Sequence, residues 1–296
     1  MAMGKVILLG EHAVVYGHPA LAGGISRGVT TIDQVVEKNS KKTSRLRIPD
    51  WDLDISSDIQ HPVALAFAAM LEAAHVGFAD LQLRSDLPAG AGLGSSAAMC
   101  VAIARCICDD DDDGEQVLAV ANAGEACFHD TPSGIDVALS MSGGIARYQK
   151  DSGLTTLACP ALPIVVGLSG IPRSTAKMVT LVRDTLREDS ALESAISEIA
   201  NLTREGQSAL LSGNLEQLGS CMNRCHHELS RLGVGVATLD TMVGIAQSAG
   251  AVGAKLTGAG GGGAIIALAP RREHEVCSAL REAGFESFST ELGSQN

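Results

Sequence analysis

Three glycines, at positions 90, 92 and 94, precede two serines in the stretch 88-PAGAGLGSSAAM-99. An apolar helical run follows, so N–H groups of the loop and of the helix start can approach an anionic ligand. No lysine follows the last glycine, unlike in the phosphate loop G-x-x-x-x-G-K-[ST]. The stretch therefore predicts a phosphate-binding loop whose positive charge comes from elsewhere in the chain. A plain glycine turn before a buried helix is the alternative.

The two serines of this stretch suit different tasks. Ser95 suits the N-cap of the helix, where a hydroxyl accepts a hydrogen bond from a backbone N–H group. Ser96 can offer its hydroxyl to a metal ion, as the Ser or Thr of a phosphate loop does.

Two carboxylates flank a turn in 125-EACFHDTPSGIDVALSMSGG-144. Glu125 ends one predicted helix and Asp136 lies in the first turn of the next, so the turn can bring both side chains to one side. The helix dipole favours the ionised form of Asp136. We therefore expect an acceptor or charge-organising group rather than a strong base. Helix-capping acids without chemistry are the alternative.

Polar groups lie at both ends of the apolar strand in 4-GKVILLGEHAVVYGHPAL-21. Lys5 heads the strand, although burying an ammonium group is costly without a partner. Glu11 and His12 follow its far end. An exposed edge lysine and a loop histidine that meets its hydrogen-bonding needs locally are the alternative.

The stretch 253-GAKLTGAGGGGAIIAL-268 has five glycines in the six residues 258–263, which lie between two predicted strands. Glycine this dense suits close approach of the backbone to a ligand or to another loop. A flexible surface hairpin is the alternative.

The elements that carry these groups alternate between strands and helices, which predicts an α+β fold with a seam near residues 150–170. The predicted strands are Lys5–Leu9, Val29–Glu37, Leu81–Ser85, Ile145–Gln149, Thr155–Ala158, Ile164–Leu168, Val252–Leu256 and Ala264–Leu268. The predicted helices are Pro62–His75, Ser96–Cys108, Glu115–Phe128, one from around Ser133, Thr175–Arg187, Ser190–Leu211, Leu215–Leu232 and Thr238–Ser248, with one more helix and strand at the end. The polar segment Lys38–Arg47 predicts a surface hairpin or loop.

Composition narrows the class of partner. A net charge of −12 and 3% aromatic residues disfavour a nucleic-acid partner. No apolar run approaches the ~18 residues of a membrane span, so we expect a cytoplasmic protein without a membrane partner. The eight cysteines form no C-x-x-C pair, which favours reduced thiols over disulfides. A metal cluster of Cys221, Cys225, His226 and His227 is a minor alternative.

Together these motifs resemble the GHMP small-molecule kinases over nearly the whole chain. The segment 169-SGIPRSTAKMV-179 is part of this resemblance. Within the family, the stretch GEHAVVYGHPAL is most similar to the branch that phosphorylates mevalonate. It implies a two-lobed fold, with an N-terminal ATP-binding domain like ribosomal protein S5 domain 2 over 1–160 and a C-terminal ferredoxin-like domain over 161–296. It also implies Mg²⁺ and ATP as co-substrate, phosphorylation of the C5 hydroxyl of mevalonate to 5-phosphomevalonate, and, by default, a homodimer.

The resemblance assigns roles by motif position. Asp136 matches the catalytic aspartate, Lys5 the lysine that contacts this aspartate and the transferred phosphoryl group, and Ser96 and Glu125 the Mg²⁺ ligands. The loop around the ATP phosphates corresponds to Pro88, Ala89, Gly90, Ala91, Gly92, Leu93, Gly94, Ser95 and Ser96. The substrate side corresponds to Lys5, Glu11, His12, Asp136, Thr175, Gly258, Ala259 and Gly260.

Three points stay open at this stage. The substrate carboxylate needs a cation, for which Arg147, Lys150 and Arg173 are candidates. The chain can also be another GHMP kinase, acting on phosphomevalonate, a sugar or a hydroxy acid. A ligand-binding homologue without catalysis is a further alternative, but retention of the four residues that match the lysine, the aspartate and the Mg²⁺ ligands argues against it.

Overall fold

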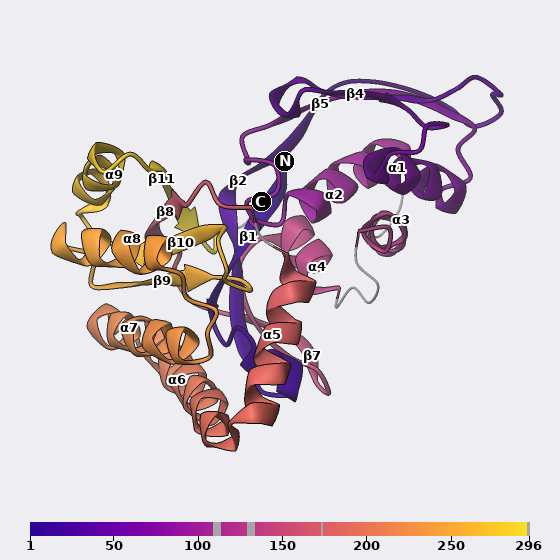
Figure 1. Cartoon of the computed structure of the whole chain (residues 1–296). Coiled ribbons are helices and arrows are strands. Elements are labelled where there is room, and N and C mark those ends of the chain that lie inside the picture. Colours follow the sequence, from indigo (N-terminus) through magenta and orange to yellow (C-terminus); the bar gives the residue numbers. More distant parts are fainter. Residues whose placement is uncertain (109–113, 129–133, 173, 295–296) are drawn as a thin grey trace.

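The computed structural model describes residues 1–108, 114–128, 134–172 and 174–294. In these ranges eleven strands form one sheet, which nine α-helices cover (Figure 1). Among the same residues, no helix combines the length and the apolar character needed to cross a bilayer.

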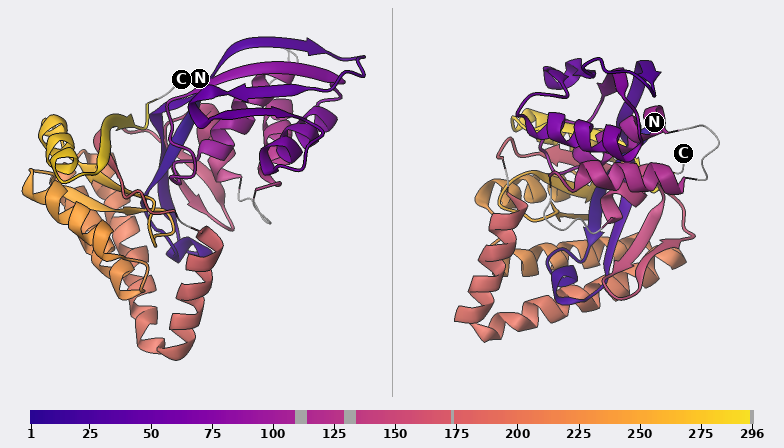
Figure 2. Two further views of the ribbon diagram at one scale, coloured as in Figure 1. Left: turned by 45° about the horizontal axis from the view of Figure 1, so that its top comes forward. Right: turned by 90° about the vertical axis from the view of Figure 1, so that its right-hand side faces the viewer.

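The N-terminal lobe is built around β2, a long strand that Figure 2 shows passing through the middle of the molecule. It pairs antiparallel with β1, β5 and β6, and meets β11 at a single register position, Ile25 opposite Leu292. The strands of this lobe are β1 (Ala2–Leu9), β2 (Ala20–Glu37), β3 (Arg45–Ile48), β4 (Leu53–Ser56), β5 (Phe78–Ser85), β6 (Ile145–Gln149) and β7 (Gly153–Leu157). Its helices are α1 (Pro62–Ala73), α2 (Ser95–Ile107), α3 (Glu115–Glu125) and α4 (Ile135–Ser142).

The C-terminal lobe has the strand order β11-β8-β10-β9, with all neighbours antiparallel. This is the order of a ferredoxin-like domain, in which the first and third strands lie in the middle. The strands are β8 (Leu162–Leu168), β9 (Gly253–Thr257), β10 (Ala264–Leu268) and β11 (Glu286–Leu292). The helices are α5 (Thr175–Glu188), α6 (Glu193–Ser212), α7 (Leu215–Arg231), α8 (Ala237–Ser248) and α9 (Glu273–Glu282). The predicted two-lobed α+β fold is confirmed.

One apolar core spans both lobes. The helix α2 belongs to this core, with every residue from Ala97 to Ala104 buried, as its uniformly apolar sequence predicts. β9 and β10 are also buried along their whole length. The expected domain boundary falls between β7 and β8, and it stays a prediction because independent folding of the two parts is untested.

The structure differs from the predicted elements mainly in the N-terminal lobe. The strand β2 begins at Ala20 rather than Val29, because its glycines, which weaken a strand signal, lie at crowded contacts. An added Cβ at Gly24, for example, would lie 2.9 Å from the Cα of Gly143. The polar segment 38–47 contains turn residues and then β3, which was not predicted. The helix expected from Ser190 begins as a 3₁₀ turn and becomes α-helical at Glu193.

Helix α7 approaches β9 so closely that only glycine fits at the crossing. An added Cβ at Gly219 would lie 2.4 Å from the Val252 carbonyl oxygen, and one at Gly253 would lie 2.4 Å from the Cα of Gly219. This crossing fixes the helix against the strand that leads to the glycine-rich loop.

We expect Gly219→Ala to lower the free energy of unfolding by about 1–3 kcal/mol, because the methyl group overpacks this crossing. The control is Gly244→Ala in α8, where an added Cβ meets nothing within 4 Å. It should raise the free energy of unfolding by roughly 0.5–1 kcal/mol through helix propensity. Urea unfolding of both variants measures the two changes in free energy of unfolding. Changes of the same sign would contradict the close packing of α7 on β9.

Candidate active site

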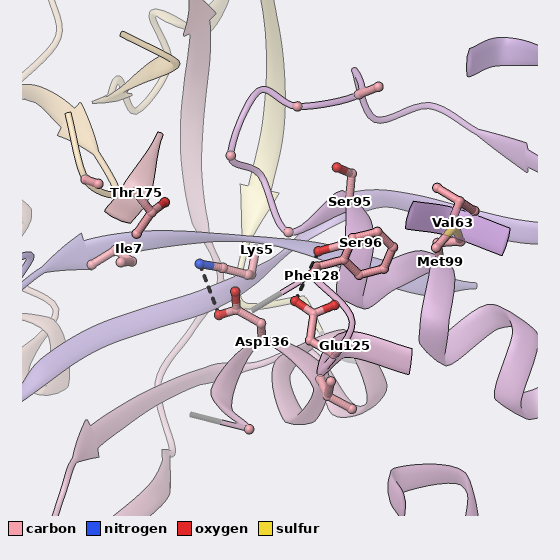
Figure 3. Close-up of a pocket in the computed structure, with 18 of the residues that line it drawn as sticks. Lys5, Ile7, Val63, Ser95, Ser96, Met99, Glu125, Phe128, Asp136 and Thr175 are labelled. Carbon is pink, nitrogen blue, oxygen red and sulfur yellow. Dashed lines mark hydrogen bonds and ion pairs between the residues drawn. The ribbon is translucent and has the colours of Figure 1, made fainter. Parts of the chain in front are cut away.

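A cavity of about 680 Å³ lies where the glycine loop of the N-terminal lobe faces the C-terminal lobe. Figure 3 shows its charged side chains in the centre, apolar ones from α1 and α2 on one side, and Ile7 and Thr175 on the other. The glycine loop after β5 supplies Ala89, Gly90, Gly92 and Gly94 to its wall, and the residues after β9 supply Gly258 and Ala259.

An ion pair joins the two charged groups at the centre of the cavity. The Nζ atom of Lys5, on β1, lies 3.0 Å from Oδ1 of Asp136, in the first turn of α4. The Lys5 side chain is 11% exposed and that of Asp136 33% exposed. The Asp136 carboxylate pairs with the ammonium and is still exposed enough to contact a ligand.

The backbone of Lys5 is tied to the glycine loop. Its N–H group donates to the Leu93 carbonyl at 2.8 Å. Gly94 adopts φ 73°, and a Cβ there would lie 2.9 Å from Cγ of Lys5. Glycine is therefore required at position 94 both for its backbone conformation and for passage of the lysine side chain.

Gly94, not Ser95, is the N-cap of α2, so the predicted N-cap is wrong. The left-handed conformation of Gly94 makes it the last non-helical residue. Ser95 is the first residue of the helix and lines the cavity. Because Gly94 has no side chain that could cap this helix start, the first N–H groups of α2 can bind an anionic ligand.

Ser96 and Glu125 form a second polar pair in the cavity wall. The Ser96 hydroxyl donates to Oε1 of Glu125 at 3.0 Å, and Glu125, the last residue of α3, is 2% exposed. Hydroxyl and carboxylate oxygens suit Mg²⁺, which is held in phosphotransferases by one or two carboxylates together with water and substrate phosphates. Within the described ranges, no group of three or more His, Cys, Asp or Glu residues could hold a metal ion. The donor set therefore fits Mg²⁺ that is bound jointly with phosphate.

The glycine-rich loop 258–263 is held by the C-terminal lobe. Gly261 donates to the Val234 carbonyl at 2.8 Å and Gly263 to the Ile171 carbonyl at 2.9 Å. Added Cβ atoms at Gly260 and Gly262 would lie 2.4 Å and 2.6 Å from these same two carbonyl oxygens. The density of glycine thus reflects close backbone packing, and Gly260 does not line the cavity although Gly258 and Ala259 do.

Glu11 and His12 do not line the cavity either. They are 1% and 5% exposed and lie behind its wall. Glu11 pairs with the ammonium of Lys255, and Nε2 of His12 lies 2.9 Å from the Ala259 carbonyl oxygen. Burial raises the pKa of Glu11 against the opposing effect of Lys255, and burial lowers the pKa of His12. His12 is therefore neutral at pH 7, and its Nε2–H group donates to Ala259.

Four apolar side chains form the other half of the cavity: Trp51, Val63, Met99 and Phe128. The indole of Trp51 donates to the Leu87 carbonyl at 2.8 Å, which fixes the ring beside the glycine loop. Sequence reasoning missed these residues. Trp51 is the only tryptophan of the chain, but it lies in a short 3₁₀ turn without a motif.

The metal cluster considered for α7 is wrong. Nδ1 of His226 accepts from the Leu256 amide at 3.3 Å, and its Nε2 lies 3.0 Å from Oδ1 of Asp240. Cys221 and Cys225 are buried free thiols, and burial raises the pKa of Cys225 to about 12. They act as small apolar residues of the core.

Comparisons with known proteins agree with this site. The profile of the GHMP kinases N terminal domain matches residues 61–144, and that of the GHMP kinases C terminal domain matches 207–286. A mevalonate kinase of Thermococcus gammatolerans is 33% identical over 320 residues, covering 99% of this chain and 96% of its own. One from Pyrococcus horikoshii is 36% identical, covering 96% and 92%. The chain belongs to the mevalonate kinase family.

A solved structure extends the similarity to the whole fold. The crystal structure of the L. major mevalonate kinase in complex with R-mevalonate has a TM-score of 0.85 to this chain. It is 27% identical and covers 99% of this chain and 94% of its own. The arrangement of the lobes is therefore that of the family.

The residues that the family resemblance assigns are mostly brought together. Lys5, Ser95, Ser96, Glu125 and Asp136 all line the cavity, as does Thr175. Pro88, Ala91 and Leu93 do not, and Leu93 is fully buried because it packs under the loop.

Two of the three candidates for the substrate carboxylate, Arg147 and Lys150, do not line the cavity. Arg147 lies on β6, where it donates to Gln149, and Lys150 is exposed in the next turn. Arg173 lies outside the described residues. Among the described residues that line the cavity, Lys5 is the only cation.

The lowered pKa of His12 predicts a pH dependence of stability. As pH falls below about 6.5, the unfolded chain takes up a proton that the folded chain resists. Wild type should have a higher free energy of unfolding than His12→Gln at neutral pH. As pH falls, this difference should decrease by up to about 1.4 kcal/mol per pH unit. Glutamine retains an N–H donor toward Ala259 but does not titrate.

Urea unfolding of wild type and His12→Gln between about pH 7.5 and pH 5.5 measures this difference. Comparing the two cancels the contribution of Glu11, whose raised pKa acts in the opposite direction. A difference that stays constant or widens as pH falls would mean that His12 is not held neutral.

Proposed function

We propose that this protein transfers the γ-phosphoryl group of ATP to the C5 hydroxyl of mevalonate, forming 5-phosphomevalonate. The observation that carries the proposal is the Lys5–Asp136 ion pair beside an uncapped helix start, in a cavity between the two lobes. The family membership supports ATP as co-substrate and mevalonate as acceptor.

The glycine loop and the start of α2 suit the phosphates of ATP. Their backbone N–H groups are neutral donors, and the α2 dipole adds a partial positive charge. The apolar side chains of Trp51, Val63, Met99 and Phe128 then provide a surface for the adenine base. ATP would thus span the cavity from its apolar half to the ion pair.

Asp136 and Lys5 suit the phosphoryl acceptor. The ionised carboxylate accepts a hydrogen bond from the C5 hydroxyl and orients its oxygen for in-line attack. Lys5 holds this carboxylate in place and offsets negative charge on the transferred group. Because phosphoryl transfer has a loose transition state, the hydroxyl proton passes to Asp136 late, after most of the bond to the leaving phosphate has lengthened.

Ser96 and Glu125 suit a Mg²⁺ ion on the phosphates of ATP. When bound, the ion neutralises charge on the β- and γ-phosphates. In the chain itself, the Ser96 hydroxyl fixes the position of the Glu125 carboxylate. This local charge compensation matters because the protein carries a net charge of −12.

We expect Asp136→Asn to lower kcat by about 10²–10⁴-fold, because the amide cannot accept the proton or pair with Lys5. ATP binding should stay within about twofold of wild type, since the phosphate loop is unchanged. Trp51, in the cavity wall, reports ATP binding through its fluorescence. Asp151→Asn, in the exposed turn after β6, is the matched control and should leave both values unchanged. Near-wild-type turnover by Asp136→Asn would refute the role of Asp136.

Turnover of Mg-ATP with mevalonate, phosphomevalonate, galactose and homoserine separates the alternatives. Turnover that responds to another acceptor but not to mevalonate would identify a different GHMP kinase. ATP binding without turnover of any acceptor would identify a non-catalytic homologue. The expected homodimer and cytoplasmic location stay predictions, which sedimentation and fractionation test.

A further inference from the structure

A fully buried ion pair joins the two lobes behind the cavity. The Lys255 side chain on β9 is 0% exposed and that of Glu11 is 1% exposed. The Lys255 ammonium also donates to the Leu256 carbonyl at 2.6 Å. Removing two charges from water costs about as much as their attraction returns, so stability alone does not account for such a pair. The phosphoryl-transfer steps above do not use it.

The contacts next to this pair all lead to the acceptor side of the cavity. The Thr257 hydroxyl donates to the Ile7 carbonyl at 2.9 Å and accepts from the Ile7 amide at 3.0 Å. The backbone of Gly258 opposes the rise that burial causes in the pKa of the Glu11 carboxyl, so it lies close to this carboxylate. The second carboxylate oxygen of Glu11, Oε2, is buried and has no hydrogen-bond partner among the described residues. His12 donates to the Ala259 carbonyl from a backbone conformation with φ 60° and ψ −46°, which is costly for a residue with a side chain. Surrounding contacts must hold His12 in this conformation.

We propose that Lys255 is a positioning residue. By pairing with Glu11 it holds the Glu11–His12 segment, and with that segment Gly258 and Ala259, at the acceptor side of the cavity. An ion pair suits this task because its energy depends on the direction and distance of both groups, whereas an apolar contact tolerates sliding. Loss of Lys255 would leave a buried carboxylate without its counter-charge and would move the start of the glycine-rich loop. The inference rests on the proposed function for what the acceptor is.

These contacts predict that loss of Lys255 impairs the use of mevalonate but not the binding of ATP. The nucleotide side is held by α2 and its loop, which are tied to Lys5 through the Leu93 carbonyl. In Lys255→Met, kcat/KM for mevalonate should fall by about 100-fold while the ATP dissociation constant stays within about twofold. Arg224→Met, which removes the two exposed ion pairs of Arg224 in the same lobe, is the control and should change neither value.

A double variant keeps the test valid if Lys255→Met folds poorly. Lys255→Met with Glu11→Gln leaves no buried charge unpaired, so it should be more stable than Lys255→Met alone. Its kcat/KM for mevalonate should nevertheless stay low, because the directional contact is lost. Wild-type kinetics of the folded double variant would show that the pair is only structural and would overturn the proposal.

Hydrogen exchange gives a readout that does not depend on the acceptor. In the folded double variant, the amides of Gly258 and Ala259 should exchange at least about tenfold faster than in wild type. Gly261 and Gly263 should stay protected, because they bond to Val234 and Ile171 within the C-terminal lobe. Unchanged exchange at 258 and 259 would overturn the positioning role, even if wild type turned over a different acceptor. Absence of mevalonate turnover by wild type would refute the proposed function alone.

Discussion

The ion pair between Lys5 and Asp136 is the interaction around which the cavity is organised. One residue of β1 contributes a side chain to Asp136 and a main-chain donor to Leu93. Two positions along the strand, Ile7 contacts Thr257 at the edge of the C-terminal lobe. The register of a single strand therefore fixes the Lys5–Asp136 ion pair, the glycine loop after β5 and the second lobe relative to one another.

The distribution of charge follows from the same arrangement. The phosphate loop contains no cation, and among the described residues of the cavity wall Lys5 alone is positive. Backbone N–H groups at the start of α2 supply further positive potential without adding a titratable group. A polyanionic ligand can thus bind to a protein of net charge −12, provided that the remaining charge comes with the ligand, as it does in Mg-ATP.

Behind the cavity, the structure uses buried polar contacts where an apolar core would suffice for cohesion. Glu11 and Lys255 face each other across the lobe boundary, and His12 reaches the Ala259 carbonyl from a strained backbone. Such contacts restrict the position of one lobe relative to the other. The glycine-rich loop needs this restriction, because its own residues have no side chains that could fix it to the N-terminal lobe.

The local sequence was enough to predict most of the helices and strands, and the motifs that carry chemistry. Glu125 at a helix end and Asp136 at a helix start follow from capping and periodicity, which depend on neighbouring residues. The family resemblance added the roles expected of Lys5 and Glu125. The predicted N-cap, Ser95, was wrong by one residue. The N-cap is Gly94, whose left-handed conformation and close contact with the Lys5 side chain admit only glycine.

Only the tertiary structure decided which polar residues face the ligand and which support the wall. Glu11 and His12 belong to a motif that suggests substrate contact, yet their partners are Lys255 and Ala259, more than two hundred residues away. Trp51 enters the cavity from a turn that no pattern distinguishes. These outcomes depend on how two lobes pack, and a contact between distant segments leaves no periodic signal in either of them. The sequence by itself determined the chemical groups and their secondary structure, while lobe packing determined their neighbours.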